Sequence, residues 1–347
     1  MNTNRIKLAL IIGIIGLFVS SACVRKPSLE KTKVKVLTSE FIYNEAPFPQ
    51  CHASTIVETD EGLLAAWFGG THERHPDVCI YTSLYRDGKW GIPERVADGA
   101  KNDTLVFPCW NPVLFKRDNN DIILYYKVGP SPREWWGMYK ISADEGKSWS
   151  AAIQIPNNLF GPIKNKPLGL PDGTILYPTS FETPQIWNIY VETSGQNLTN
   201  WRKTEINNNG FNAIQPTVLF YKGGVVQMLC RSKEKRIVET WSSDNGKTWS
   251  PLQATSIPNN NSGIDAVSLG NGLQVLICNP VEQGRNKLAV LVSSDGKNWK
   301  KLIVLEDQPE GEFSYPAIIR GKDGKIHITY TYNREKIKYV RLEILYE

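Results

Sequence analysis

Short stretches of alternating apolar and polar residues recur along most of the chain, and this pattern predicts strands. Each set consists of a strand, a polar turn, a second strand, a loop and a third strand that enters a glycine-containing turn. The six expected sets are 54–58, 63–68 and 78–85; 112–116, 121–128 and 136–142; 166–170, 174–179 and 186–192; 216–221, 224–231 and 236–241; 265–269, 272–278 and 287–292; and 316–319, 325–332 and 337–343.

One turn motif follows the third strand of most sets. Ser242–Trp249 reads Ser-Ser-Asp-Asn-Gly-Lys-Thr-Trp, Ser142–Trp149 has the same form, and Ser293–Trp299 is one residue shorter. Two degenerate copies end at Trp90 and Trp201, so the five tryptophans are 59, 52, 48 and 50 residues apart. Asp suits a tight hairpin because it caps backbone N–H groups, and Gly because it accepts positive φ. These residues are expected to be scaffold.

A strand-rich repeat of about 40–50 residues is typical of propeller blades. Five tryptophan turns and a last set without one predict an all-β protein with six blades. The alternating segment 33–43 is expected to close the ring by pairing with the last blade. Because the repeat covers the chain, residues 33–347 are expected to form one domain.

The first residues have the pattern of an export signal. Arg5 and Lys7 precede an apolar run from Leu8 to Val19, and three small residues then lead to Cys23. We expect a signal peptide over 1–22, a lipid on Cys23 and a tether over 23–32. The protein is then expected to be a periplasmic or outer-membrane bacterial lipoprotein that is bound to the membrane only by its lipid. A lipoprotein box normally has Leu where Ser20 stands, so simple cleavage or an uncleaved anchor is the alternative.

Composition narrows the class of partner. The net charge is +5 without any basic block, which argues against nucleic acid and is compatible with an acidic substrate. Eleven tryptophans suit a surface that faces carbohydrate. The other five cysteines are Cys51, Cys79, Cys109, Cys230 and Cys278. None of them is part of a close Cys-X-X-Cys pair, so we expect buried free thiols, and we expect no metal and no cofactor.

Propeller topology selects a ring of polar residues. The starts of first strands and the ends of second strands converge at the central channel of a propeller, away from the tryptophan turns, so a wet, charged pocket is expected there. The first group comprises His52, Trp110, Asn111, Lys164, Lys166, Gln215, Asp265 and Tyr315. The second comprises His72 to Asp77, Lys127, Glu182, Arg231, Asn279 to Arg285, and Asn333 with Arg334.

The turn motif Ser-X-Asp-X-Gly-X-Thr-Trp resembles the Asp-box of the sialidase (neuraminidase) superfamily. The segments Trp110–Leu114 and Gly161–Leu168 resemble a bacterial branch described as predicted neuraminidases, over nearly the whole mature chain. The resemblance implies a sialidase-like six-bladed propeller and an exo-glycosidase that removes a terminal acidic sugar from a glycan or polysaccharide. That branch name reflects fold more securely than activity.

The resemblance also implies roles for individual residues. Sialidases clamp a carboxylate with three arginines and use an Asp acid/base with a Tyr nucleophile that a Glu assists. The matching residues are Asp77 as acid/base, Arg231 and Arg285 in the clamp, and Tyr315 as nucleophile. Each has a structural alternative: a loop turn after proline for Asp77, blade-stabilising contacts for the arginines, and packing for Tyr315.

Two positions depart from the sialidase pattern. His52 stands where the first arginine is expected, and Gln215 stands where the Glu is expected. A Gln side chain cannot take the tyrosine proton, so the Tyr–Glu couple is broken if the mapping holds.

Other side chains are available for the chemistry. His52, His72 and His75 are possible neutral bases, and their spacing does not support a metal site. Glu182 and Asp265 are spare carboxylates for an acid/base pair. Four cations are able to hold a uronic acid, namely Lys127, Lys164, Lys166 and Arg334. Four tryptophans are candidates for stacking on sugars or for blade packing: Trp110, Trp135, Trp136 and Trp187.

Three hypotheses follow. The first is an exported exo-glycosidase for a terminal acidic sugar, with Asp77 as acid/base. The second is a uronide-directed hydrolase or lyase that uses His52 or a neighbour as base. The third is a lipid-anchored propeller that binds glycans without catalysis.

Overall fold

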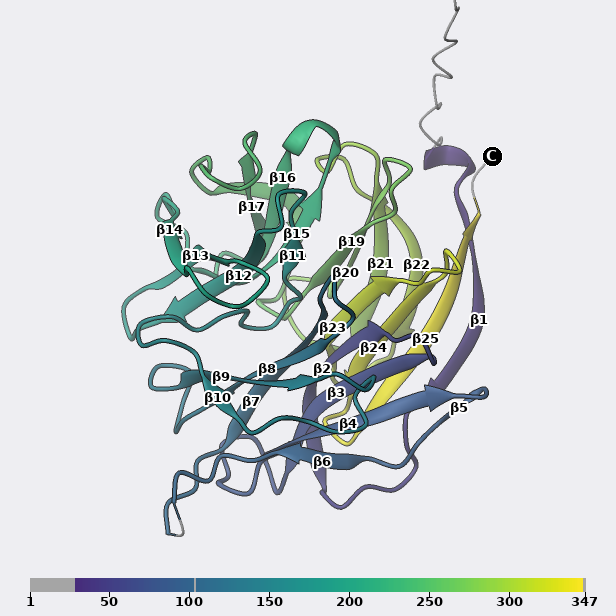
Figure 1. Ribbon diagram of the computed structural model, residues 1–347. Helices are drawn as coiled ribbons and strands as arrows, with labels where there is room; N and C mark the ends of the chain where they lie inside the picture. Colours follow the sequence, from purple (N-terminus) through teal and green to yellow (C-terminus); the bar gives the residue numbers. More distant parts are fainter. Residues whose placement is uncertain (1–28, 103, 346–347) are drawn as a thin grey trace, which may run out of the picture.

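The computed structural model describes residues 29–102 and 104–345, and these residues fold into six antiparallel sheets around a centre (Figure 1). The expected signal peptide and Cys23 lie outside the described residues. In the described part, no helix has the length and apolarity needed to cross a membrane. The expectation of an all-β, six-bladed propeller is confirmed.

Each sheet is one blade, numbered here in chain order. Blade 1 contains β2 (Gln50–Glu58), β3 (Leu63–Gly70), β4 (Cys79–Arg86), β5 (Lys89–Trp90) and β6 (Glu94–Ala97). Blade 2 contains β7 (Cys109–Lys116), β8 (Ile122–Val128), β9 (Trp136–Ser142) and β10 (Ile153–Gln154). Blade 3 contains β11 (Leu168–Gly169), β12 (Ile175–Glu182), β13 (Trp187–Ser194) and β14 (Arg202–Glu205).

Blade 4 contains β15 (Ala213–Phe220), β16 (Val226–Ser232), β17 (Arg236–Ser242) and β18 (Gln253–Pro258), with the short 3-10 helix η2 (Lys222–Gly224) between its first two strands. Blade 5 contains β19 (Asp265–Ser268), β20 (Gln274–Cys278), β21 (Lys287–Ser293) and β22 (Lys300–Asp307). Blade 6 contains β23 (Phe313–Arg320), β24 (Ile326–Tyr332), β25 (Lys336–Leu345) and β1 (Lys33–Phe41), which the 3-10 helix η1 (Leu29–Lys31) precedes.

The N-terminal strand closes the ring. β1 pairs antiparallel with β25 from Lys33 opposite Leu345 to Phe41 opposite Lys338, and Figure 1 shows the two strands side by side. The first described strand is thus the outer strand of the last blade, as expected from the sequence. This pairing covers the edge of β25, which would otherwise present unpaired backbone groups.

Apolar residues of neighbouring blades pack together between the sheets. Leu64 and Ile80 of blade 1 pack in one cluster with Ile122 and Leu124 of blade 2, and all four side chains are essentially inaccessible to solvent. Similar clusters join the later blades. The five described cysteines are buried and unpaired in these interiors, as expected.

The tryptophan turns are held by their aspartates. In Ser142–Trp149, Asp144 accepts hydrogen bonds from the hydroxyls of Ser142 at 2.8 Å and Ser148 at 2.5 Å, and also from the Ser148 N–H. The bond from the Ser148 hydroxyl is the largest cause that lowers the pKa of Asp144 to about 2. Equivalent bonds form at Asp244 and Asp295. The turns are scaffold, as the sequence indicated.

Four first strands begin three or four residues earlier than the sequence pattern suggested. β2, β7, β15 and β23 each carry a register shift near their start, which is the mark of a β-bulge. One residue of each bulge has positive φ: Ala53 at 56°, Asn111 at 40°, Gln215 at 54° and Tyr315 at 51°. Such backbone is strained for residues other than Gly and is common at functional sites. The four bulges stand at equivalent positions of blades 1, 2, 4 and 6.

Candidate active site

Tyr315, Gln215 and Arg231 form the centre of the candidate site. Two of them stand at the bulges of blades 6 and 4, and Arg231 lies near the end of β16. An N–H of Arg231 donates to the Tyr315 hydroxyl oxygen at 2.6 Å and to the Gln215 side-chain carbonyl at 3.1 Å. The Gln215 amide lies 3.4 Å from the same hydroxyl oxygen. Charge that develops on the phenol oxygen would therefore face a guanidinium group.

His52 packs against this tyrosine from blade 1. Its ring centroid is 4.1 Å from that of Tyr315, and its Nδ1 lies 3.0 Å from the Thr331 hydroxyl. Burial lowers the pKa of His52 well below its ordinary value, and the charges of Arg334, Arg285 and other nearby cations lower it further. His52 is therefore neutral at pH 7.

Two more arginines complete a cationic wall. The Arg285 guanidinium carbon is 5.8 Å from the Tyr315 ring, and that of Arg231 is 5.6 Å away. Arg334, from the loop after β24, and Arg285 share one carboxylate, because Glu312 binds Arg285 at 2.8 Å and Arg334 at 3.0 Å. Although burial raises the pKa of Glu312, these two arginines hold it below its ordinary value.

The loop that follows β3 is tied to this wall. Glu73 accepts a hydrogen bond from Arg334 at 2.5 Å, so blade 1 and blade 6 are linked beside the site. Sequence reasoning placed Glu73 in the channel ring only as part of His72 to Asp77, and gave Glu312 no role. Their arginine partners are distant in the chain or lie in another blade, and only the fold reveals the pairing.

Asp77 is engaged within its own loop. Its carboxylate accepts hydrogen bonds from the Thr71 N–H at 3.0 Å and hydroxyl at 2.6 Å, and His75 Nδ1 is 2.7 Å away. Partial burial raises the pKa of Asp77, but the Thr71 bonds and His75 outweigh it and lower the pKa overall. His72 and His75 stand on the same exposed loop with ring centroids 5.2 Å apart. These bonds are those of a loop turn, and the acid/base role of Asp77 stays a prediction.

Glu182 faces the site from blade 3. It ends β12 and lies opposite Trp187, the first residue of β13. Trp187 is flanked by Lys233, whose Nζ is 4.3 Å from the ring centroid, and by Arg231 at 5.8 Å. Burial raises the pKa of Glu182, although Arg231 and three other cations oppose the rise. Of the four tryptophans that the sequence offered, Trp187 is the one in contact with the arginine centre.

Lys164, Lys166 and Asp265 cross-link the channel below the tyrosine. The Lys164 ammonium group donates to Asn165, to the Ile264 carbonyl and to the Pro316 carbonyl. The Lys166 ammonium group donates to both Asp265 oxygens and to the Ala266 carbonyl.

An ammonium group has three N–H donors, so neither lysine has one left for a ligand. Burial lowers the pKa of Lys164 to about 7. Asp265 is buried and also accepts hydrogen bonds from Thr217 and the Ile318 N–H. These contacts engage the two ammonium groups and the Asp265 carboxylate within the protein, and the expected roles of Lys164 and Lys166 in holding a sugar and of Asp265 in an acid/base pair stay predictions.

Lys127, Trp110 and Asn111 belong to the interior of blade 2. Lys127 is fully buried and donates to the Pro162 carbonyl at 2.7 Å. The buried indole of Trp110 donates to the Gly129 carbonyl at 2.8 Å and packs against Trp135. Asn111 is buried at its bulge. The polar groups of Lys127 and Trp110 are thus bonded within the protein, and a contact of these three residues with substrate stays a prediction.

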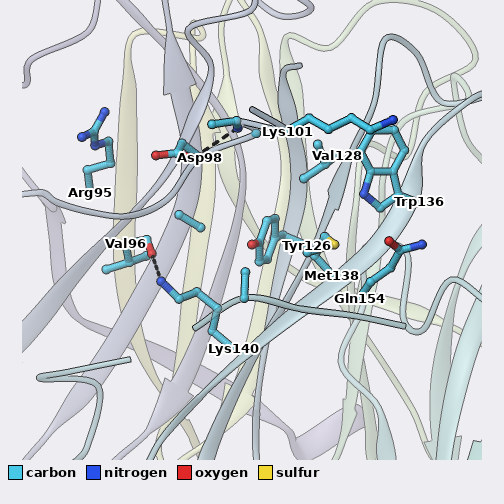
Figure 2. Close-up of a pocket in the computed structure, with 14 residues that line it drawn as sticks. Arg95, Val96, Asp98, Lys101, Tyr126, Val128, Trp136, Met138, Lys140 and Gln154 are labelled. Carbon is cyan, nitrogen blue, oxygen red and sulfur yellow. Dashed lines mark hydrogen bonds between the residues drawn. The ribbon is translucent and has the colours of Figure 1, made fainter. Parts of the chain in front are cut away.

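A separate groove of about 610 Å³ lies between blades 1 and 2 (Figure 2). Figure 2 shows Tyr126 at its middle, Trp136 at one side with Lys101 beside it, and Lys140 donating to the Val96 carbonyl at 2.7 Å. None of its lining residues belongs to the arginine centre. In the described ranges, no group of three His, Cys, Asp or Glu side chains is placed to hold a metal ion.

The comparisons with known proteins agree with this architecture. A family model described as BNR repeat-like domain matches residues 61–328. A search of curated proteins gives no match.

Several solved structures share the fold. A protein of unknown function from Dyadobacter fermentans is 15% identical with a TM-score of 0.75, and the match covers 90% of this chain and 99% of that one. A variant of the NanB sialidase from Streptococcus pneumoniae is 12% identical with a TM-score of 0.71, over 88% of this chain and 70% of that one. The intramolecular trans-sialidase from Ruminococcus gnavus, bound to oseltamivir carboxylate, is 13% identical with a TM-score of 0.67, over 87% and 96%. At these identities the likeness establishes the fold.

Proposed function

The chain belongs to the BNR repeat-like domain family, and from this membership and its sialidase-like fold we propose that it is an exported exo-glycosidase that removes a terminal acidic sugar, sialic acid or a related one, from glycans. The observation that carries the proposal is the placement of Arg231 and Arg285 beside Tyr315, with guanidinium carbons 5.6 Å and 5.8 Å from the centroid of its ring. Planar guanidinium groups match the geometry of a carboxylate, and a neutral tyrosine avoids placing an anion against an anionic sugar.

A third arginine supports the same proposal. His52 occupies the position expected for the first clamp arginine, and after burial the charge of nearby Arg334 is the next cause that lowers the pKa of His52. Arg334 also shares Glu312 with Arg285. A bound carboxylate would take the place of Glu312 on one or both guanidinium groups, which gives the site three arginines without an arginine at position 52.

Tyr315 has an activating partner other than a carboxylate. Gln215 cannot remove the phenol proton, whereas the Arg231 N–H at 2.6 Å stabilises negative charge on the phenol oxygen. In this proposal Tyr315 is the nucleophile and Arg231 both stabilises it and holds the sugar carboxylate.

His52 favours a second candidate function. A neutral imidazole packed on Tyr315 is suited to remove a proton from a sugar, so a uronide-directed hydrolase or lyase is the alternative. A lyase would form an unsaturated product that absorbs in the near ultraviolet.

The test is product analysis. The purified full chain is incubated with sialyllactose and with uronic-acid oligosaccharides, and the products are identified by mass spectrometry. Release of a free acidic sugar, lost in Tyr315→Phe and retained in the control Arg202→Ala on exposed β14, supports the glycosidase. An unsaturated uronide supports the lyase. Glycan binding without any product would overturn both and leave a binding protein.

A further inference from the structure

We propose that Glu182, rather than Asp77, is the acid/base of this site and transfers the proton to and from the glycosidic oxygen. The inference rests on the proposed glycosidase function and adds to it the residue that the leaving group contacts. Glu182 is the last residue of β12, where the second strand of blade 3 ends at the channel.

The carboxylate of Glu182 stands on the strand pair that carries Trp187, which contacts Arg231. Glu182 is half-buried, and no hydrogen bond or ion pair engages its carboxylate in the part of the chain that the structure describes. Its cross-strand neighbour Trp187 lies against Arg231, the residue that also binds Tyr315. Glu182 thus has a free carboxylate one side chain away from the proposed carboxylate clamp.

Four cations from three other blades act on Glu182. Arg231 and Lys233 belong to blade 4, Arg133 lies in the loop between β8 and β9, and Arg74 lies in the loop between β3 and β4. Each of these cations favours the charged carboxylate, yet burial has the larger effect and the pKa of Glu182 is raised overall. A bound acidic sugar would partly neutralise Arg231 and add a like charge nearby, so both effects would raise the pKa of Glu182 further in the complex.

Asp77 is in the opposite situation. Two hydrogen bonds from Thr71 and the contact with His75 stabilise its charged form, and its side chain is 48% exposed. A carboxyl group whose pKa is lowered is a poor proton donor near neutral pH. These bonds also fix the path of the loop that carries Glu73, which gives Asp77 a structural role.

The proposed step balances as a hydrolysis. The proton of the Glu182 carboxylic acid goes to the glycosidic oxygen while the Tyr315 oxygen bonds to the anomeric carbon. The bond between that carbon and the glycosidic oxygen breaks with its electron pair left on the oxygen, and the phenol proton passes to solvent. The products of this half are the alcohol, the Glu182 carboxylate and a covalent sugar–tyrosine intermediate. Water then attacks the anomeric carbon, gives one proton to Glu182 and displaces the Tyr315 phenolate, which takes up a proton from solvent.

The experiment compares two substrates that carry the same acidic sugar. One is a natural glycan, whose leaving alcohol needs a proton, and the other is a 4-nitrophenyl glycoside, whose leaving group does not. Full chains with Glu182→Gln, Asp77→Asn and the matched control Glu205→Gln, an exposed glutamate of the same blade, are assayed on both, and thermal unfolding checks that they fold.

We expect Glu182→Gln to lose about 100-fold or more in kcat/KM on the natural glycan and much less on the nitrophenyl glycoside. A structural role would lower both activities alike. The fall of wild-type activity at alkaline pH, where an acid with a raised pKa loses its proton, should also disappear in this variant.

Two results would overturn the inference while leaving the proposed function in place: unchanged or equally reduced activity of Glu182→Gln on both substrates, or the selective loss in Asp77→Asn instead. If the wild-type chain released sugar from neither substrate, the proposed function would fail first and this inference with it.

Discussion

The guanidinium group of Arg231 donates to the hydroxyl oxygen of Tyr315 at 2.6 Å, although 84 residues separate them in the chain. The two residues come from blades 4 and 6 and meet because a bulge at the start of β23 turns Tyr315 toward the channel. The contact joins the proposed nucleophile to the proposed carboxylate clamp.

Removal of this contact should abolish most of the activity. Arg231→Ala deletes the N–H donor that faces the phenol oxygen, and loss of one such donor typically costs about 100- to 1,000-fold in kcat. Steady-state kinetics on the substrate identified by product analysis measures the loss, with Arg202→Ala as the control on exposed β14. Activity within a factor of about two of wild type would exclude a role for Arg231 in the chemistry.

The ion pair between Lys166 and Asp265 should matter for stability. Asp265 is buried and accepts hydrogen bonds from Lys166, which precedes β11, and from blades 4 and 6. Asp265→Ala therefore leaves a lysine without its counter-ion and should cost about 3–5 kcal/mol in the free energy of unfolding. Urea unfolding measures the cost. The exposed pair Lys203 and Glu205 is the control, since Glu205→Ala should cost less than about 1 kcal/mol. Equal costs for the two variants would contradict the cross-linking role of Asp265.

The turn aspartates should make stability fall at acid pH. The pKa values of Asp144, Asp244 and Asp295 are lowered to about 2 in the fold from an ordinary value of 3.8. Because the folded-state pKa is the lower one, their contribution is fully present above about pH 4 and is lost as the pH falls toward 2.

Unfolding of wild type and Asp244→Ala at several pH values checks this prediction. The variant should be less stable by about 1–3 kcal/mol at pH 7, and the difference should shrink as the pH approaches 2. A difference that did not depend on pH would show that the charge of Asp244 is unimportant.

Substitution of two glycines with the same backbone conformation should distinguish the stability cost of backbone strain from that of a steric clash. Gly246 and Gly173 have φ of 81° and 82°, but a Cβ on Gly246 would stand 2.5 Å from Leu176 while one on Gly173 would meet nothing within 4 Å. Gly173→Ala should therefore cost about 1–2 kcal/mol for the left-handed backbone alone. Gly246→Ala should cost about 1–3 kcal/mol more, because the added methyl group would clash with Leu176 and push the turn away from blade 3. Thermal unfolding that ranked Gly173→Ala as the more harmful change would contradict the packing shown for the turn.

Much of the fold follows from the sequence because its signals are local. The spacing of the tryptophan turns predicts the blades, and the alternation in 33–43 predicts the closing strand. The first strands were expected to begin at Ser54, Pro112, Pro216 and Pro316 because a bulge breaks the alternation just before these residues. The short outer strands were not expected individually, since β10 and β14 are exposed and have little apolar pattern.

The site was only partly predictable because position along a strand does not fix side-chain direction. Topology correctly brings His52, Arg231 and Arg285 to Tyr315. The same rule selects Lys127, yet its ammonium group is fully buried and donates to the Pro162 carbonyl. At the start of a strand, the side chains of successive residues point alternately toward the channel and toward the interior. A bulge shifts this alternation by one residue.

The most direct test of the central claim compares an acidic sugar with its carboxyl methyl ester. The full chain is assayed on sialyllactose or on the uronic-acid glycan found to be cleaved, and then on the ester of the same compound, which keeps the shape but loses the charge. If the arginine centre recognises a carboxylate, the ester should lose at least about 100-fold in kcat/KM with wild type, and Arg231→Ala should reduce this discrimination. Equal cleavage of acid and ester by the wild-type chain, or cleavage of neither, would contradict the account.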